Sequence, residues 1–196
     1  MGGSAVDTRP MTVEDFYVFT DARPDNEKWE LFDGEPFLNA SPASHHQVII
    51  KNLIINLGMR ERELRPAWVV IPGIGARVSP ISRPEPDVMI LPRQGESLDP
   101  GYRDATEAMV LIEVMSPSTS RRDLKWKREA YTSMAALTHY IVVAQDKVEV
   151  VVFSRDRGFA EHRLRSPDDI VDLSALGGKA ATLRNLSRHR ASLTVN

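Results

Sequence analysis

The chain has no cysteine, and this absence removes several classes of site at once. None of its 196 residues is cysteine, so disulfide scaffolds, cysteine-ligated zinc sites and thiol catalysis are excluded. Such a chain suits a reducing compartment, and we expect a cytoplasmic location. No apolar run approaches the roughly 20 residues of a membrane span, and the N-terminus lacks the basic-then-apolar pattern of a secretory signal. We therefore expect no membrane association.

An excess of positive charge is also missing. The formal net charge is −2 at pH 7, so no overall positive field draws the protein to nucleic acid, and any such affinity must come from a local patch. The composition is 42% hydrophobic and 27% charged, which is typical of a globular domain. The length corresponds to one domain. We expect residues 1–10 to be flexible and residues 11–196 to form a single domain.

Hydrophobic patterning predicts an α/β domain with a mixed central sheet flanked by helices. Asp33-Gly34 separates two short segments, 29–32 and 36–40, and favours an N-terminal β-hairpin. Helical spacing of apolar residues predicts helices over 45–63 and 121–136, and a short helix is expected over 11–16. Further strands are expected at 68–71, 76–78, 87–91, 109–114, 140–144 and 148–153, with 159–164 as a candidate edge strand.

Two acids lie in strands that are otherwise apolar. Asp87 opens one of these strands, and Glu113 lies near the end of another. Burying an ionised carboxylate costs several kcal/mol unless a partner compensates it, and two neighbouring carboxylates repel each other. A divalent cation would relieve both effects, and oxygen ligands select Mg²⁺ or Mn²⁺. The alternative is that each acid lies at an exposed strand end or pairs with an arginine.

The helix after Glu113 carries a lysine on the face turned toward the sheet. Helical geometry places Lys127 on this face, whereas Arg122, Lys125 and Trp126 point away. A lysine on the buried face of a helix needs an anionic partner, and the strand acids are the candidates. The alternative is a lysine whose stem packs while its ammonium reaches water. We expect Trp126 to be exposed, as a candidate subunit contact.

These residues stand in a pattern that resembles a known family. The pattern comprises Pro86-Asp87, residues 113–119, Asp123, Lys127 and Tyr131, together with residues 30–35, Ser41-Pro42 and His46-Gln47 near the N-terminus. Over roughly residues 11–155 the chain is similar to the Uma (DUF820-type) family of restriction-endonuclease-like proteins, within the PD-(D/E)XK nuclease superfamily. The resemblance implies the restriction-endonuclease-like fold and metal-dependent hydrolysis of phosphodiester bonds in DNA.

The resemblance also implies a role for each site residue. Asp87 and Glu113 would hold Mg²⁺ or Mn²⁺, with the backbone carbonyl of Val114 as a further ligand. Lys127 would complete the catalytic set from the helix, because Met115 stands where the wider superfamily has its lysine. The supporting residues would be Glu30 near the metal, His46 toward the substrate or a ligand, and Asp123. For Asp123 the alternative is a plain first-turn acid, which helices favour.

The basic surface of the same helix is a candidate DNA contact. Arg121, Arg122 and Lys125 could follow phosphates, although runs of charge are usually solvated faces. Cutting two strands suits a two-fold pair of sites, so we expect a homodimer. Two other functions stay open. One is a catalytically inactive nucleic-acid-binding module with a nuclease fold, which the net negative charge and Met115 favour. The other is a metal-dependent hydrolase of a small phosphorylated molecule.

Overall fold

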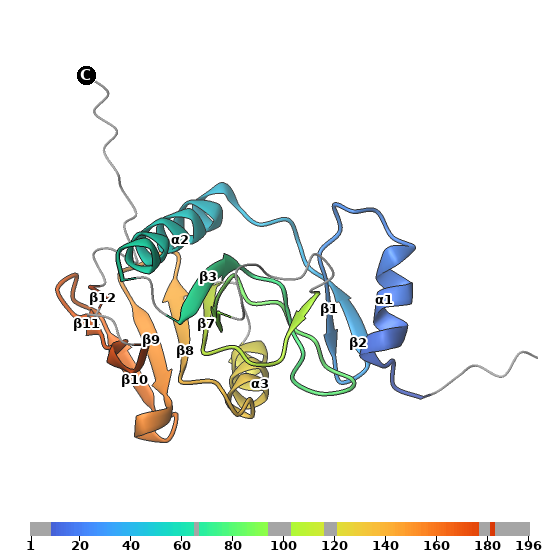
Figure 1. Ribbon diagram of the computed structural model, residues 1–196. Coiled ribbons are helices and arrows are strands. Elements are labelled where there is room, and N and C mark those ends of the chain that lie inside the picture. The colour runs from blue at the N-terminus through green and yellow to red at the C-terminus, as the bar shows by residue number, and fades with distance from the viewer. Residues whose placement is uncertain (1–8, 65–66, 94–102, 116–120, 177–180, 183–196) are drawn as a thin grey trace, which may run out of the picture.

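A six-stranded mixed sheet forms the centre of the protein (Figure 1). The computed structural model describes residues 9–64, 67–93, 103–115, 121–176 and 181–182. In spatial order the strands are β10 (Glu161–Leu164), β9 (Val150–Ser154), β8 (His139–Ala144), β7 (Val110–Met115), β5 (Val88–Pro92) and β3 (Trp68–Pro72). The β7–β8 pair is parallel and the other neighbours are antiparallel. The predicted mixed sheet is therefore confirmed.

Two helices cover the opposite faces of this sheet (Figure 1). Helix α2 (Ser44–Leu64) buries Ile49, Leu53 and Leu57 against one face, at the helical spacing that the sequence predicts. Helix α3 (Arg121–Thr132) covers the other face, where Tyr131 packs against Tyr140 with ring centroids 5.2 Å apart. Neither of these helices, nor any other in the described part of the chain, is long and apolar enough to cross a membrane.

A hairpin layer stands beside the sheet (Figure 1). It consists of helix α1 (Val13–Asp21) and the antiparallel strands β1 (Trp29–Phe32) and β2 (Glu35–Leu38). Asp33 and Gly34 at the turn have positive φ angles of 49° and 84°, which suits the tight hairpin turns that match strand twist. The predicted hairpin is confirmed, and α1 continues beyond the short helix expected over 11–16.

The two faces of the hairpin have different neighbours. On one face, Trp29 and Leu31 pack against α1. The other face carries Glu30 and, directly opposite it on β2, Phe37. Directly opposed residues of an antiparallel pair point to the same side. The hairpin therefore presents Glu30 and Phe37 together, away from α1.

Helix α3 ends four residues before the predicted end at residue 136. The reason is a long-range contact, because Arg155 binds the backbone of the segment that follows the helix. Its guanidinium donates to the carbonyl oxygens of Leu137, Met134 and Ala135, at 2.7, 2.9 and 3.0 Å. A side chain from β9's end thus stabilises a turn where helical spacing alone predicts more helix.

Several short elements complete the structure. They are β4 (Gly75–Ala76), β6 (Asp104–Ala105), β11 (Ile170–Val171), β12 (Ala181–Thr182) and the 3₁₀ turns η1 (Arg155–Arg157) and η2 (Ser174–Leu176). Strand β4 pairs in parallel with β6, and β11 pairs with β12. The strand expected at 76–78 is present only as the two residues of β4, whereas β6, β11 and β12 carry too little pattern to be predicted from sequence.

The edge strand β3 is protected on its free side. Alternate N–H groups of an edge strand point outward. The outward N–H of Val70 donates to Glu61 Oε2 of helix α2 at 3.0 Å, and Arg93 holds the other Glu61 oxygen at 2.6 Å. The next outward position is Pro72, which has no N–H. Two successive outward positions of β3 therefore offer no free donor.

Glu149, just before β9, should stabilise the fold in a pH-dependent way. Its carboxylate is 8% exposed and is paired with Arg165, Lys147 and Arg163 at 2.7, 3.0 and 3.0 Å. The hydrogen bond from Arg165 is the largest of the effects that lower the pKa of Glu149 to about 2. Because the folded pKa lies below the unfolded value, this stabilisation is present above pH 4.5 and is lost as the pH falls toward 2.

We expect Glu149→Gln to lower the free energy of unfolding by about 1–2 kcal/mol at pH 7, discounted because the cationic partners are exposed. Urea unfolding at pH 7 and at pH 2.5 checks this, and the difference from wild type should largely disappear at pH 2.5. An equal difference at both pH values would contradict the assignment.

Candidate active site

A polar cavity of about 680 Å³ lies where the hairpin, the start of α2 and α3 meet the end of β7. Asp87 immediately precedes β5, and Glu113 lies on β7, its antiparallel neighbour. The pairing of these two strands sets the two acids side by side at the cavity. Glu30 from β1 and Lys127 from α3 line the same cavity.

Asp87 is held by two protein donors on one oxygen. The backbone N–H of Val114 donates to Asp87 Oδ2 at 2.7 Å, and His46 Nε2 lies 3.3 Å from the same atom. Gly73 allows this arrangement, because a Cβ at residue 73 would lie 1.4 Å from the carbonyl oxygen of Pro86. The carboxylate of Asp87 is therefore fixed in orientation, and its Oδ1 takes no hydrogen bond from the described residues.

Glu113 is fixed in the same manner from α3. Lys127 Nζ and the Tyr131 hydroxyl both donate to Glu113 Oε1, at 3.0 and 2.8 Å. Burial raises the pKa of Glu113 to about 7; the nearby carboxylates of Asp87 and Glu30 act in the same direction, and Lys127 and Tyr131 oppose them. Glu113 Oε2 takes no hydrogen bond from the described residues.

Lys127 also joins the hairpin to the sheet. Its ammonium donates to Glu30 Oε1 at 3.1 Å, and its side chain is only 11% exposed. Glu30 is fixed further by the backbone N–H of Glu85 at 2.5 Å and by the amide of Asn39 at 2.9 Å. One buried cation therefore bridges carboxylates that are 83 positions apart in the sequence (residues 30 and 113).

His46 supplies a further polar group at the cavity wall. The hydrogen bond to Asp87 raises its pKa, the Val114 carbonyl adds to the effect, and burial opposes both. Its Nδ1 is buried and has no hydrogen-bond partner among the described residues. A buried polar atom without a partner is costly, and such atoms are often found at functional sites.

The donor set fits a hard divalent cation with few protein ligands. In the described ranges, no three His, Cys, Asp or Glu side chains lie close enough to form a complete metal cage. Asp87 and Glu113 nevertheless each keep one oxygen without a donor from the described residues. Mg²⁺ is commonly held by only one or two carboxylates and retains several waters. The carboxylates of Asp87 and Glu30 also raise the pKa of Glu113, so a cation that offset their charge would favour its ionised, ligating form.

The structure brings five of the predicted site residues together. Asp87, Glu113, Lys127, Glu30 and His46 all line this cavity, and the Val114 backbone is part of it. Helix α3 includes Arg121, Arg122 and Asp123, but their side chains lie outside the described part of the structure. Lys125 is 70% exposed and lies 3.8 Å from Glu129, one turn away on the same helix.

Two residues to which the sequence assigned no role support the cluster. Tyr131 binds Glu113, and Asn39 binds Glu30. Tyr131 belongs to the family pattern, and its role could have been predicted because it lies four residues after Lys127 and therefore on the same helical face. Asn39 carried no such signal, since its role depends on the hairpin's position against α3.

The prediction that Trp126 is exposed is wrong. Its indole donates to Asp33 at 2.7 Å, and its ring packs edge-on against Phe32 with centroids 4.6 Å apart. The helical wheel placed Trp126 opposite the sheet but could not show that the hairpin turn covers that side of α3. Trp126 is only partly exposed and joins α3 to the hairpin turn.

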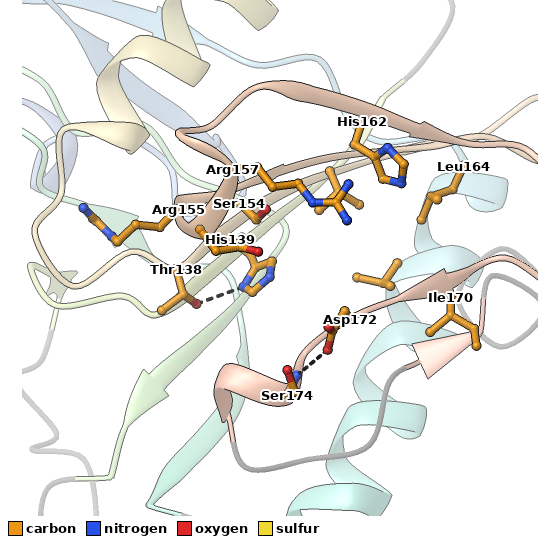
Figure 2. Close-up of a pocket in the computed structure, with 13 residues that line it drawn as sticks. Thr138, His139, Ser154, Arg155, Arg157, His162, Leu164, Ile170, Asp172 and Ser174 are labelled. Atoms are coloured by element: carbon orange, nitrogen blue, oxygen red, sulfur yellow. Dashed lines mark hydrogen bonds between the residues drawn. The ribbon is translucent and has the colours of Figure 1, made fainter.

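A second cavity, of about 600 Å³, lies against β8, β9 and β10 (Figure 2). His139 faces it from the sheet, and Asp172 and Ser174 form its far wall. Figure 2 shows Arg155 directed away from this cavity, consistent with its bonds to backbone carbonyls. Asp172 in turn accepts the backbone N–H of Ser174 at 2.9 Å. Two acids, Asp156 and Asp172, line this cavity, but no lysine is among the described residues that line it.

Comparisons with known proteins agree with this architecture. The family model Uma2, described as "Putative restriction endonuclease", matches residues 13–184. A crystal structure from Anabaena variabilis ATCC 29413, described as a "putative nuclease belonging to DUF820", superposes with a TM-score of 0.75 at 12% identity, over 92% of this chain and 99% of that one. No curated protein gives a significant match. The predicted restriction-endonuclease-like fold is confirmed.

Proposed function

The chain belongs to the Uma2 family, and we propose that it is a metal-dependent endonuclease that hydrolyses phosphodiester bonds in DNA. The family's description and the nuclease fold support a nuclease-like function. The observation that carries the finer proposal is the pair of acids on adjacent strands. Asp87 and Glu113 each have one oxygen bound by protein donors and one oxygen that takes no hydrogen bond from the part of the chain that the structure describes. Lys127, which donates to Glu113, is buried.

Each part of this cluster suits phosphodiester hydrolysis. Asp87, Glu113 and the Val114 carbonyl would hold Mg²⁺ or Mn²⁺, which supplies charge neutralisation on the phosphate and a water of lowered pKa. Lys127 would orient the attacking water and oppose negative charge in the transition state. Glu30 and Tyr131 would keep the lysine and Glu113 in place, because both are bonded to these groups.

The remaining expectations belong to the same proposal. We infer that the protein acts as a homodimer in the cytoplasm, since a two-fold pair of sites suits a double-stranded substrate. Lys125, with Arg121 and Arg122 from the same helix turn, would contact DNA phosphates. The exposure of Lys125 supports this assignment.

The test is calorimetric titration of Mn²⁺ and Mg²⁺ into wild type and Asp87→Ala, with parallel incubation of supercoiled plasmid. We expect wild type to bind metal and nick plasmid, and Asp87→Ala to lose both. Glu85→Gln is the matched control, because the side chain of this cavity acid pairs with Lys28 and Arg83, and its bond to Glu30 comes from the backbone N–H, which the substitution keeps. It should keep both properties.

Two results would contradict the proposal. Wild type that binds no metal at millimolar concentration would exclude the metal-dependent mechanism. Metal binding without cleavage of any DNA would favour the inactive binding module or a hydrolase of small phosphorylated molecules.

A further inference from the structure

A half-exposed aromatic ring lies beside the candidate active site. Phe37 is 48% exposed, and it stands directly opposite Glu30 in the hairpin. Its ring is therefore on the hairpin face that carries Glu30 to Lys127, and not on the face that packs against α1. Leu38, the next residue, is 53% exposed but belongs to the opposite face.

The Phe37 ring is held in place by a chain of aromatic contacts. It packs edge-on against Phe32, with centroids 5.4 Å apart and planes at 74°. Phe32 packs in the same way against Trp126 of α3, which is itself fixed by its bond to Asp33. An edge-to-face pair covers at most one face of either ring, so Phe32 leaves at least one face of Phe37 uncovered. The series runs from α3 to the protein surface and ends at Phe37.

Polar groups on the same face complete the surroundings of Phe37. Lys28 and Asn39 both line the catalytic cavity and are adjacent across the two strands, where the N–H of Asn39 donates to the carbonyl oxygen of Lys28 at 2.8 Å. The Lys28 side chain is 40% exposed, although its ammonium lies 3.3 Å from Glu85. A cation and an amide thus line the cavity, and Phe37 stands on the same hairpin face, directly opposite the cavity residue Glu30.

We propose that Phe37 is a stacking platform for an unpaired nucleobase next to the bond that is cut. This inference rests on the proposed nuclease function and names the form of its substrate. Grooves that bind single strands combine basic residues with aromatic rings on which bases stack. In an intact duplex the base faces are already stacked on each other. The substrate of this site therefore includes an unpaired stretch.

Binding of a labelled single-stranded oligonucleotide, measured by fluorescence anisotropy in the presence of Ca²⁺, tests the proposal. A gel checks that the oligonucleotide is not cut during the measurement. We expect Phe37→Ala to raise the dissociation constant about 5- to 100-fold, the range for loss of one stacked base, and Phe37→Tyr to restore binding. Leu38→Ala is the matched control, with equal exposure on the other face, and should change the constant less than twofold. Blunt-ended duplex should bind more weakly and respond little to Phe37→Ala.

Equal effects of Phe37→Ala and Leu38→Ala would overturn the inference, as would an equal loss of duplex and single-strand binding. Both results leave the proposed function intact if wild type still binds metal and cleaves DNA. Wild type that neither binds nor cleaves nucleic acid would instead reject the proposed function and this inference together. Thermal unfolding of each variant shows whether a loss of binding reflects a loss of fold.

Discussion

Replacing Lys127 with methionine should lower both the stability of the protein and its activity. The Lys127 ammonium is buried between Glu30 and Glu113, at 3.1 and 3.0 Å. Removing one partner from a buried ion pair costs about 3–5 kcal/mol, because the other charge remains buried without compensation. Here two carboxylates lose the same cation. We expect urea unfolding at pH 8 to show a loss in this range, together with loss of plasmid nicking.

A variant two residues away provides the control for Lys127→Met. Lys125 lies on the same helix and is 70% exposed, so Lys125→Met should change the free energy of unfolding by less than about 0.5 kcal/mol. Adding Glu30→Gln to Lys127→Met should recover part of the stability, since one uncompensated charge is removed, but none of the activity. A Lys127→Met protein as stable as wild type would show that this buried bridge does not support the fold.

Glu113→Gln should have the second large effect, with activity and stability moving in opposite directions. Glutamine is a much poorer ligand for a divalent cation, so we expect nicking to fall by about 10³-fold or more. The pKa of Glu113 is raised to about 7, above its unfolded value of 4.5. Its ionised form therefore destabilises the metal-free fold at pH 8, and this penalty disappears as the pH falls below 7. Removing the charge should raise stability at pH 8.

Urea unfolding in EDTA at pH 8 and pH 5 measures this effect. The gain of Glu113→Gln over wild type should be present at pH 8 and small at pH 5, where wild type also carries a protonated Glu113. Tyr131 can still donate to the glutamine oxygen, so the geometry at that position is kept. Stability that falls at pH 8 would contradict the interpretation of Glu113 as a destabilising buried charge.

Local sequence patterns predicted most of the helices and strands, because these depend on turn residues and on apolar periodicity within short segments. The Asp33-Gly34 turn, the apolar stripe of α2 and the apolar runs of the central strands each correspond to a structural element. The sheet-facing position of Lys127 also follows from helical geometry alone, and the structure places its ammonium at Glu113. The family resemblance supplied the roles of these residues, which stay predictions.

The remaining features depend on contacts between distant segments. The exposure of Trp126 was mispredicted because the hairpin that covers it comes 93 residues earlier in the chain. The early end of α3 depends on Arg155, which begins the 3₁₀ turn η1 after β9. Asn39 was missed because it acts through Glu30, and nothing near it in sequence marks that contact. Such contacts can be identified only once the tertiary structure is known.

The arrangement at β3 has a consequence for how copies of this protein can meet. The Val70 N–H already donates to Glu61, and Pro72 has no N–H. An approaching strand from a second molecule would have to displace the Glu61 carboxylate, which Arg93 already holds. It would still lack a backbone hydrogen bond at Pro72, which has no N–H to donate. Edge-to-edge pairing of β-sheets, which leads to aggregation, is thereby disfavoured at β3. A second copy of this chain that met the molecule at β3 would therefore have to bind through side chains, where shape and charge can limit the contact to a single partner.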